Sequence, residues 1–501
     1  MLKRIDLFSV LKSCTSKNKQ NNDEKVDENK QFSACLKQSL ASLGPLILTV
    51  VVGMTLGYSA VLLPQLQAHT NVAITINKEE ASWVASLAVI PMAAGALIGG
   101  VLIQKYGRKM THIIICFPYC AGWILMYFSF NLQMLLTGRF LTGLCSGIIT
   151  PATGVYIGET TDPKNRGMLL GGIPLSVSVG LLGSHLLGTF LTWQVTALVV
   201  AVFPFIAWLL MTFTPESPAW LAQKGLSDEA QESFYWLRNA SEENRQEFEQ
   251  MIARVKATNN NTNKIDEKNR LKELLEPEFW KPMAILLVFF ISSQWAGVNA
   301  VTFYSINIMK QTLGESINEY LATFIIDCIR VIASIAQCIL IRNIGRRPLA
   351  LTGGFGTFIP LFILSGFIYS QKVFNIQNPN LVAVPITCLL AYVFFVTAGF
   401  VSLPWNLIGE LLPMAKRSTG SGIASFVAYM SIFSVVKTMP ALFENLGTDG
   451  SFLVYGFMAL LGTAFVYRCL PETKGKTLHE IEEYFKDSKE DNSKGPLDTR
   501  L

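Results

Sequence analysis

Apolar runs of about 20 residues recur along most of this chain, and a helix needs a run of that length to cross the hydrocarbon core of a bilayer. Roughly twelve such runs lie between Gly44 and Leu470. Only 15% of the 501 residues are charged, whereas a soluble protein carries about a quarter. The sequence therefore predicts an all-α polytopic membrane protein.

Basic residues indicate how the spans are oriented. Lysine and arginine gather in alternate short loops, for example at Lys105, Arg108, Lys164 and Arg342, whereas the other loops hold isolated lysines such as Lys78. Because cytoplasmic loops carry the excess of basic residues, both termini are predicted to be cytoplasmic.

Polar and apolar segments divide the chain into five parts. We expect a disordered cytoplasmic tail at 1–42, an N-terminal six-helix half at 43–213, a cytoplasmic helical linker at 214–280, a C-terminal six-helix half at 281–470 and a cytoplasmic C-terminal tail at 471–501.

The two halves repeat each other. Three pairs of motifs occur in the same order at equivalent loops: Gly107-Arg108-Lys109 with Gly345-Arg346-Arg347, Glu159 and Arg166 with Glu410 and Arg417, and Pro215-Glu216-Ser217 with Pro471-Glu472-Thr473. Parallel repeats are a transporter architecture in which the substrate site lies between the halves, near the membrane midplane.

The segment Ser293–Ser305, SQWAGVNAVTFYS, is unusually polar for an apolar run. Gln294, Asn299 and Thr302 follow one another at helical spacing and could share one face. Amides inside a membrane need a bonding neighbour or a wet cavity, and their paired donors and acceptors suit a neutral polyol. The alternative is that these amides only bond neighbouring helices.

These features resemble the sugar porter family of the major facilitator superfamily. The resemblance covers about Gly44 to Tyr484 and rests on the repeated motifs, on PESPAWL at Pro215–Leu221, on PETKGKTL at Pro471–Leu478 and on the Gln294–Asn299 segment. LPQL at Leu63–Leu66 is similar to insect facilitated trehalose or glucose transporters. The resemblance implies a twelve-span major facilitator fold that alternates between outward-open and inward-open states.

The resemblance also implies sugar contacts at particular residues. These are Gln294, Asn299, Tyr304 and Trp405, with the Trp405 ring stacking on the sugar. Several amides that the family usually carries are absent, because Ser293, Pro174 and Ala428 occupy their positions. Each lost amide removes a hydrogen bond worth about 0.5–1.5 kcal/mol, which leaves the identity of the sugar open.

Charged residues at the cytoplasmic ends of the spans form a candidate inner gate: Arg108, Glu159, Arg166, Glu216, Arg346, Glu410, Arg417 and Glu472. Opposite charges there could pair across the halves in one state and separate in the other, which would bias a two-state equilibrium. The alternative is that they are ordinary basic anchors of cytoplasmic loops.

Arg330 lies in the middle of an apolar span, where the resemblance implies a neutral amide that faces the cavity. An arginine at a helix centre costs roughly 2.5–3.5 kcal/mol on insertion scales. Asp327, three residues earlier, could neutralise it in a self-contained pair. Alternatively, Arg330 reaches the cavity and contacts substrate, or favours an anion.

These observations favour facilitative uniport of a sugar, trehalose or glucose, across the plasma membrane. The first span, Gly44–Leu63, has no acidic residue, which favours passive transport over proton coupling. Two alternatives stay open: a carrier of an anionic or modified small molecule that uses Arg330, and a non-transporting nutrient sensor.

Other classes of protein are excluded by the residues. No nucleophile–base set for an enzyme can be assembled, and the four histidines are too dispersed for a metal site. No basic stripe suggests nucleic acid. We therefore expect no cofactor and no metal, and as partners only a sugar and the lipid bilayer around a monomer.

Overall fold

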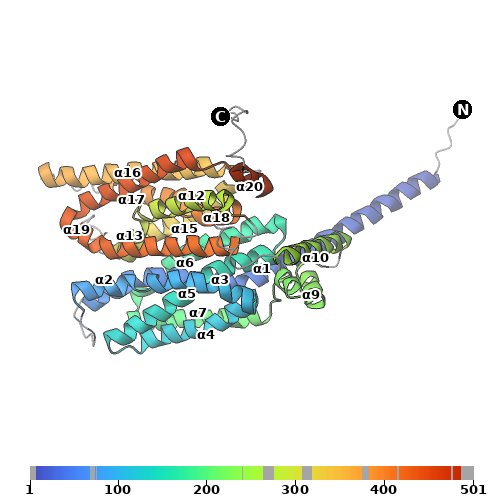
Figure 1. Ribbon diagram of the computed structural model, residues 1–501, viewed down its shortest axis with the longest axis horizontal. Helices are drawn as coiled ribbons and strands as arrows, with labels where there is room; N and C mark the ends of the chain where they lie inside the picture. Colours follow the sequence, from blue (N-terminus) through green and yellow to red (C-terminus); the bar gives the residue numbers. More distant parts are fainter. Residues whose placement is uncertain are drawn as a thin grey trace.

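The computed structural model is an elongated bundle of helices, in which the two halves of the chain lie side by side (Figure 1). It describes residues 7–67, 74, 76–239, 241–262, 276–306, 308, 319–374, 383–413, 417–474 and 478–486, and no strand occurs among them. The end of the bundle that carries α9, α10 and α20 is called the linker end below, and the opposite end, where α2 lies, is called the far end (Figure 1).

The first half contains seven helices: α1 (Leu7–Gln67), α2 (Lys78–Ser86), α3 (Val89–Tyr106), α4 (Arg108–Tyr127), α5 (Leu132–Thr160), α6 (Pro163–Phe190) and α7 (Trp193–Thr212). Capping side chains set several of their starts. The Asn131 side chain accepts a hydrogen bond from the Met134 amide at 2.8 Å where α5 begins, and the Asn77 side chain caps α2. Such caps satisfy amides that have no partner within the helix.

The linker and the second half follow. The linker holds α8 (Pro218–Gln223), α9 (Ser227–Arg238) and α10 (Glu242–Thr262). The second half holds α12 (Pro277–Gln294), α13 (Val298–Phe303), α15 (Glu319–Asn343), α16 (Arg346–Phe374), α17 (Ala383–Phe395), the π-helical turn η3 (Val396–Val401), α18 (Leu403–Leu411) and α19 (Arg417–Cys469), and α20 (Leu478–Lys486) follows.

The helices account for twelve crossings. Ten helical segments of the described residues are long and apolar enough to span a membrane. The last of them, Thr419–Cys469, contains two crossings, because Gly447 has φ 72° and breaks α19 near its middle. The broken helix α12–α13 adds the remaining crossing, since α12 ends at Gln294 before the apolar run does. The predicted twelve-span, all-α fold is confirmed.

The tail expected to be disordered spans 1–42, and the structure describes residues 7–42 of it. Helix α1 begins at Leu7 and continues without a break into the span. The buried Gln38 side chain donates to the Asp162 carboxylate at 2.6 Å and accepts from the Asp162 amide at 3.1 Å. Its amide also donates to the Leu237 carbonyl of α9 at 3.3 Å. The last turns before the span are therefore docked against α9 and the turn that precedes α6.

The outer faces of both halves remain strongly apolar. Val101 is 64% exposed, Phe117 61% and Phe205 57%, although all three are large hydrophobic residues. Exposed apolar surface on this scale is typical of contact with lipid. The two halves meet each other mainly along α6 with α15 and along α3 with α19.

Small residues let the helices of the first half approach closely. A Cβ added at Gly143 would lie 2.1 Å from the Ala88 carbonyl oxygen, and one added at Gly147 would lie 2.1 Å from that of Met92. Because α3 and α5 touch through their backbones here, each position requires glycine.

Gly147→Ala should therefore destabilise the protein. Overpacking of this kind typically costs about 1–3 kcal/mol. Gly154→Ala, on the same helix, is the matched control, because no atom lies within 4 Å of the added Cβ. Thermal unfolding in detergent should give a lower midpoint for Gly147→Ala alone, and equal midpoints would contradict the close approach of α3 and α5.

Candidate functional site

The polar segment predicted from the sequence is a break between two helices. Helix α12 ends at Gln294, and α13 starts at Val298 after Gly297, which has φ 87°. This left-handed conformation favours glycine, and a Cβ at Gly297 would also lie 2.6 Å from the Tyr455 ring. Helices broken at membrane depth occur where they are buried in protein or line a cavity.

The two predicted amides meet across this break. Asn299 Nδ2 donates to Gln294 Oε1 at 2.5 Å, and Gln294 is only 1% exposed. Thr302, which the spacing grouped with them, donates instead to the Val298 carbonyl of its own helix at 2.9 Å. The Gln294 NH2 group and the Asn299 carbonyl oxygen take no part in this bond, so the pair keeps donors and an acceptor for another partner.

An aromatic cluster lies beside the break. Trp405, near the start of α18, is half-buried, and its ring centroid lies 4.9 Å from that of Phe290 and 5.8 Å from that of Tyr429. Phe290 precedes Gln294 by four residues and so shares its helix face. The Tyr429 hydroxyl is 2.7 Å from the Thr150 hydroxyl of α5. The cluster therefore connects the break in the second half with the first half.

Tyr304 lies elsewhere on the same segment, just after α13. It is 7% exposed and lines a small space together with Ala60, Leu63 and Pro64 of α1. The C-terminal end of the segment Gln294–Tyr304 thus touches the first half. The Gln294–Asn299 amide pair lies one helical turn or more away from this contact.

Arg330, on α15, is 4% exposed, and its neighbour Asp327 has a second partner in the other half. Its Nη1 lies 3.6 Å from Asp327 Oδ1, and Asp327 Oδ2 is 2.5 Å from His185 Nδ1 of α6 in the other half. The expected Asp327–Arg330 pair is therefore part of a group of three. His185 is not among the site residues predicted from the sequence, although a histidine inside an apolar run is itself an unusual signal.

Charged residues at the linker end follow the same pattern in both halves. In the first half, Arg108 Nη2 donates to Glu159 Oε1 at 2.8 Å. Glu216 accepts from the Arg108 and Lys109 amides, both at 2.9 Å, at the start of α4. The Ser217 hydroxyl donates to Glu159. A carboxylate at a helix N-terminus satisfies unpaired amides and interacts favourably with the helix dipole.

The second half repeats this arrangement. Arg346 Nη2 donates to Glu410 Oε1 at 2.7 Å, Glu472 accepts from the Arg346 amide at 2.8 Å, and the Thr473 hydroxyl donates to Glu410 at 2.6 Å. A Cβ added at Gly345 would lie 2.2 Å from the Glu472 carboxylate, so a larger residue there would displace this side chain from the Arg346 amide. The duplicated motifs therefore form duplicated ion-pair clusters.

These ion pairs lie within one half, whereas the sequence analysis considered pairing across the halves. Among the described residues at the linker end, Arg108–Glu159 and Arg346–Glu410 each join two residues of the same half. Arg166 is exposed at the start of α6, and the Arg417 side chain lies outside the described residues. A cross-half inner gate stays a prediction.

Arg139 is a buried cation that the sequence analysis did not identify. It is 0% exposed and donates to the Thr55 carbonyl at 3.0 Å, to those of Ala85 and Val84 at 3.2 and 3.3 Å, and to the Ser59 hydroxyl. The last turn of α2 supplies two of these carbonyls, at the negative end of its dipole. Arg139 thereby holds α1, α2 and α5 together.

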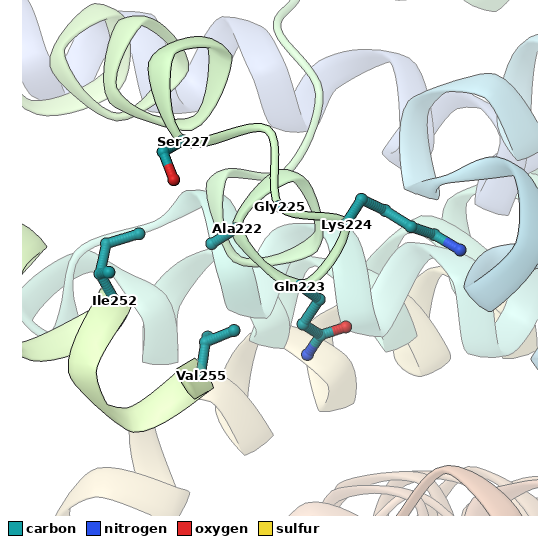
Figure 2. Close-up of a pocket in the computed structure, with 7 residues that line it drawn as sticks. All are labelled: Ala222, Gln223, Lys224, Gly225, Ser227, Ile252 and Val255. Carbon is teal, nitrogen blue, oxygen red and sulfur yellow. The ribbon is translucent and has the colours of Figure 1, made fainter. Parts of the chain in front are cut away.

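A separate pocket lies in the linker, away from the break (Figure 2). Its lining is Ala222, Gln223, Lys224, Gly225, Ser227, Ile252 and Val255. Figure 2 shows that the Lys224 side chain points away from Ile252 and Val255. In the part of the chain that the structure describes, no group of three or more His, Cys, Asp or Glu side chains is placed to hold a metal ion.

Twelve crossings in two repeated halves form the major facilitator fold. The fold is similar to the proton:xylose symporter XylE bound to 6-bromo-6-deoxy-D-glucose, with a TM-score of 0.75 at 20% identity, over 89% of this chain and 99% of that one. A family profile described as "Sugar (and other) transporter" matches residues 15–485, and the chain belongs to this family. Its members are transporters and not enzymes.

Two curated relatives are insect proteins. The facilitated trehalose transporter Tret1-2 homolog of Drosophila simulans is 31% identical over 446 residues, which cover 89% of this chain and 90% of that protein. Facilitated trehalose transporter Tret1 of Drosophila grimshawi is also 31% identical, over 447 residues and 89% of this chain. This chain spans only 47% of the latter protein's length.

Double-mutant cycles should detect the pairing within each half. Residues in direct contact show coupling energies of about 0.5–3 kcal/mol, whereas distant sites add to within roughly 0.5 kcal/mol. Arg346→Gln with Glu410→Gln should therefore couple in thermal unfolding, and Arg108→Gln with Glu410→Gln should add. Coupling in the cross-half cycle alone would overturn the assignment.

Proposed function

We propose that this chain is a facilitative carrier of a neutral sugar, trehalose or glucose, across the plasma membrane, and that it works as a monomer by alternating access. The observation that carries this proposal is the Gln294–Asn299 amide pair, which lies at a helix break beside Trp405 and Tyr429. The names of the trehalose-transporter relatives support the same class of cargo.

The chemistry of the break suits a polyol. A sugar presents hydroxyls that both donate and accept, and the spare donor and acceptor of the amide pair match them. The apolar face of a sugar ring packs well on an aromatic side chain such as Trp405. The side chains of Gln294, Asn299 and Trp405 can therefore replace part of a sugar's hydration shell. None of these contacts requires a charged cargo.

Contacts between the halves support alternating access. At the far end, Lys78 Nζ lies 3.3 Å from Glu444 Oε1, and Lys437 Nζ lies 4.0 Å from the centroid of the Trp83 ring. The ion pairs described at the linker end stay within one half. We interpret this arrangement as closed at the far end, and the excess of basic residues in alternate loops favours a cytoplasmic linker end with both termini on that side.

The charges inside the bundle support passive transport. The first span has no carboxylate that could carry a proton. Backbone carbonyls and a hydroxyl surround Arg139, and Asp327 is already engaged by His185 and Arg330. Since Asp327 and Arg330 also balance each other's charge, an anionic cargo has less support than a neutral one.

Substitutions at the break should weaken sugar binding. Gln294→Ala or Asn299→Ala should raise KM about 10- to 100-fold, because a lost hydrogen bond and an unsatisfied partner cost about 1–3 kcal/mol. Thr302→Val is the matched control, since its hydroxyl bonds only to its own helix in the structure. The KM of each variant is measured by uptake of radiolabelled trehalose and glucose into proteoliposomes. Equal effects at all three positions would contradict the assigned site.

The same proteoliposomes test the class of cargo and the energy source. Sugar uptake should continue at the same initial rate after a protonophore collapses the proton gradient, whereas a reconstituted proton:xylose symporter should lose accumulation. Loss of uptake with the protonophore would contradict uniport. Competition by organic anions alone would favour an anion carrier, and absence of any flux would favour a sensor.

A further inference from the structure

One face of α15 carries a polar stripe that packs against α6 of the other half. Asp327, Arg330, Ser334 and Gln337 recur at intervals of three or four residues and therefore share this face. Three contacts cross to α6: Asp327 with His185 at 2.5 Å, the Ser334 hydroxyl with that of Ser178 at 2.7 Å, and Cys338 Sγ with the Gly171 carbonyl at 3.1 Å. The halves thus meet through polar side chains at membrane depth.

Asp327 divides its carboxylate unequally between two partners. Oδ2 accepts a hydrogen bond from His185 Nδ1 at 2.5 Å, whereas Oδ1 lies 3.6 Å from Arg330 Nη1, beyond ordinary hydrogen-bond range. All three side chains are buried, at 6% exposure or less. The stronger contact of the carboxylate is therefore with the other half, and not with the arginine on its own helix.

Arg330 consequently keeps donors without partners. Its Nε and Nη1 are buried and have no hydrogen bond among the described residues. A buried guanidinium in this state is unfavourable unless another acceptor is provided. Tyr392 is close enough to interact electrostatically with Arg330, and its hydroxyl donates to the Ala296 carbonyl at 2.8 Å. Tyr392 thus links the surroundings of Arg330 with the helix break that holds the amide pair.

We propose that His185 is a positioning residue for the sugar site. With α6 and α15 packed together, His185 holds Asp327 and leaves Arg330 able to donate to a sugar hydroxyl at the break. When the halves part at this interface, Asp327 returns to Arg330 and withdraws those donors. This inference rests on the proposed sugar transport and explains how binding of a neutral polyol would favour the packed interface.

The charge balance supports a neutral ligand over an anion. The positive charge of Arg330 is already compensated by Asp327, and only the directed donors are left over. A hydroxyl oxygen accepts such donors without adding charge to the buried site. The Asp327 carboxylate can accept hydrogen bonds from His185 or from Arg330. A small movement of α6 is therefore enough to transfer the carboxylate from one partner to the other.

The test uses the full chain in proteoliposomes and the KM of equilibrium exchange for radiolabelled trehalose and glucose. His185→Ala should raise this KM about 10-fold and change the maximal exchange rate less than about twofold, because Asp327 then moves to Arg330. His185→Gln keeps a donor toward Asp327 and should restore most of the affinity. In an Asp327→Asn background, His185→Ala should have no further effect on KM.

Ser178→Ala is the matched control, because it removes the neighbouring contact between α6 and α15 without touching a charged group. Its KM should equal that of the wild type. A 10-fold rise in Ser178→Ala as well, or a further rise for His185→Ala in the Asp327→Asn background, would mean that His185 only holds the interface and would overturn the inference.

Failure of this inference can be told apart from failure of the proposed function. Sugar exchange by the wild type with an unchanged KM in His185→Ala would discard the role of His185 and keep sugar transport. Absence of exchange by the folded wild type would discard both. If Asp327→Asn does not fold, the comparison of His185→Ala with His185→Gln still decides, because only the glutamine can replace the donor.

Discussion

The break between α12 and α13 is the constraint on which the rest of the site depends. In a membrane, backbone groups released from a helix need partners inside the protein. Gly297 allows the chain to turn, the Tyr392 hydroxyl binds the Ala296 carbonyl, and Asn299 binds Gln294 across the gap. The break is thus stabilised by bonds inside the protein, and it holds the Gln294 and Asn299 side-chain amides in the interior. A continuous apolar helix would hold no amide side chain there.

The clusters at the linker end explain how each half can behave as a unit. Glu216 and Glu472 close the turns before α4 and α16, and Arg108 and Arg346 tie those turns to Glu159 and Glu410. Because each cluster stays within one half, motion between the halves need not break it. In the proposed alternating access, the contacts that would change are those between the halves, such as Lys78 with Glu444 and His185 with Asp327.

Two buried arginines illustrate different ways to hold a cation in a membrane protein. Arg139 is surrounded by backbone carbonyls from α1 and α2, so its donors are satisfied and it serves packing. Arg330 has a carboxylate nearby that is engaged by His185, so part of its guanidinium is left without partners. An unsatisfied buried cation is costly, and a site that retains one is a candidate for ligand binding.

The sequence by itself determined the twelve spans and their duplication, because hydropathy and short loop motifs are local properties of the chain. It also indicated Gln294 and Asn299, since amides are conspicuous in an apolar run. Tertiary structure decided that Arg346 pairs with Glu410 of its own half and that His185 meets Asp327. Such contacts depend on how separate helices pack, and His185 and Asp327 lie in different halves of the chain, so no local pattern contains them.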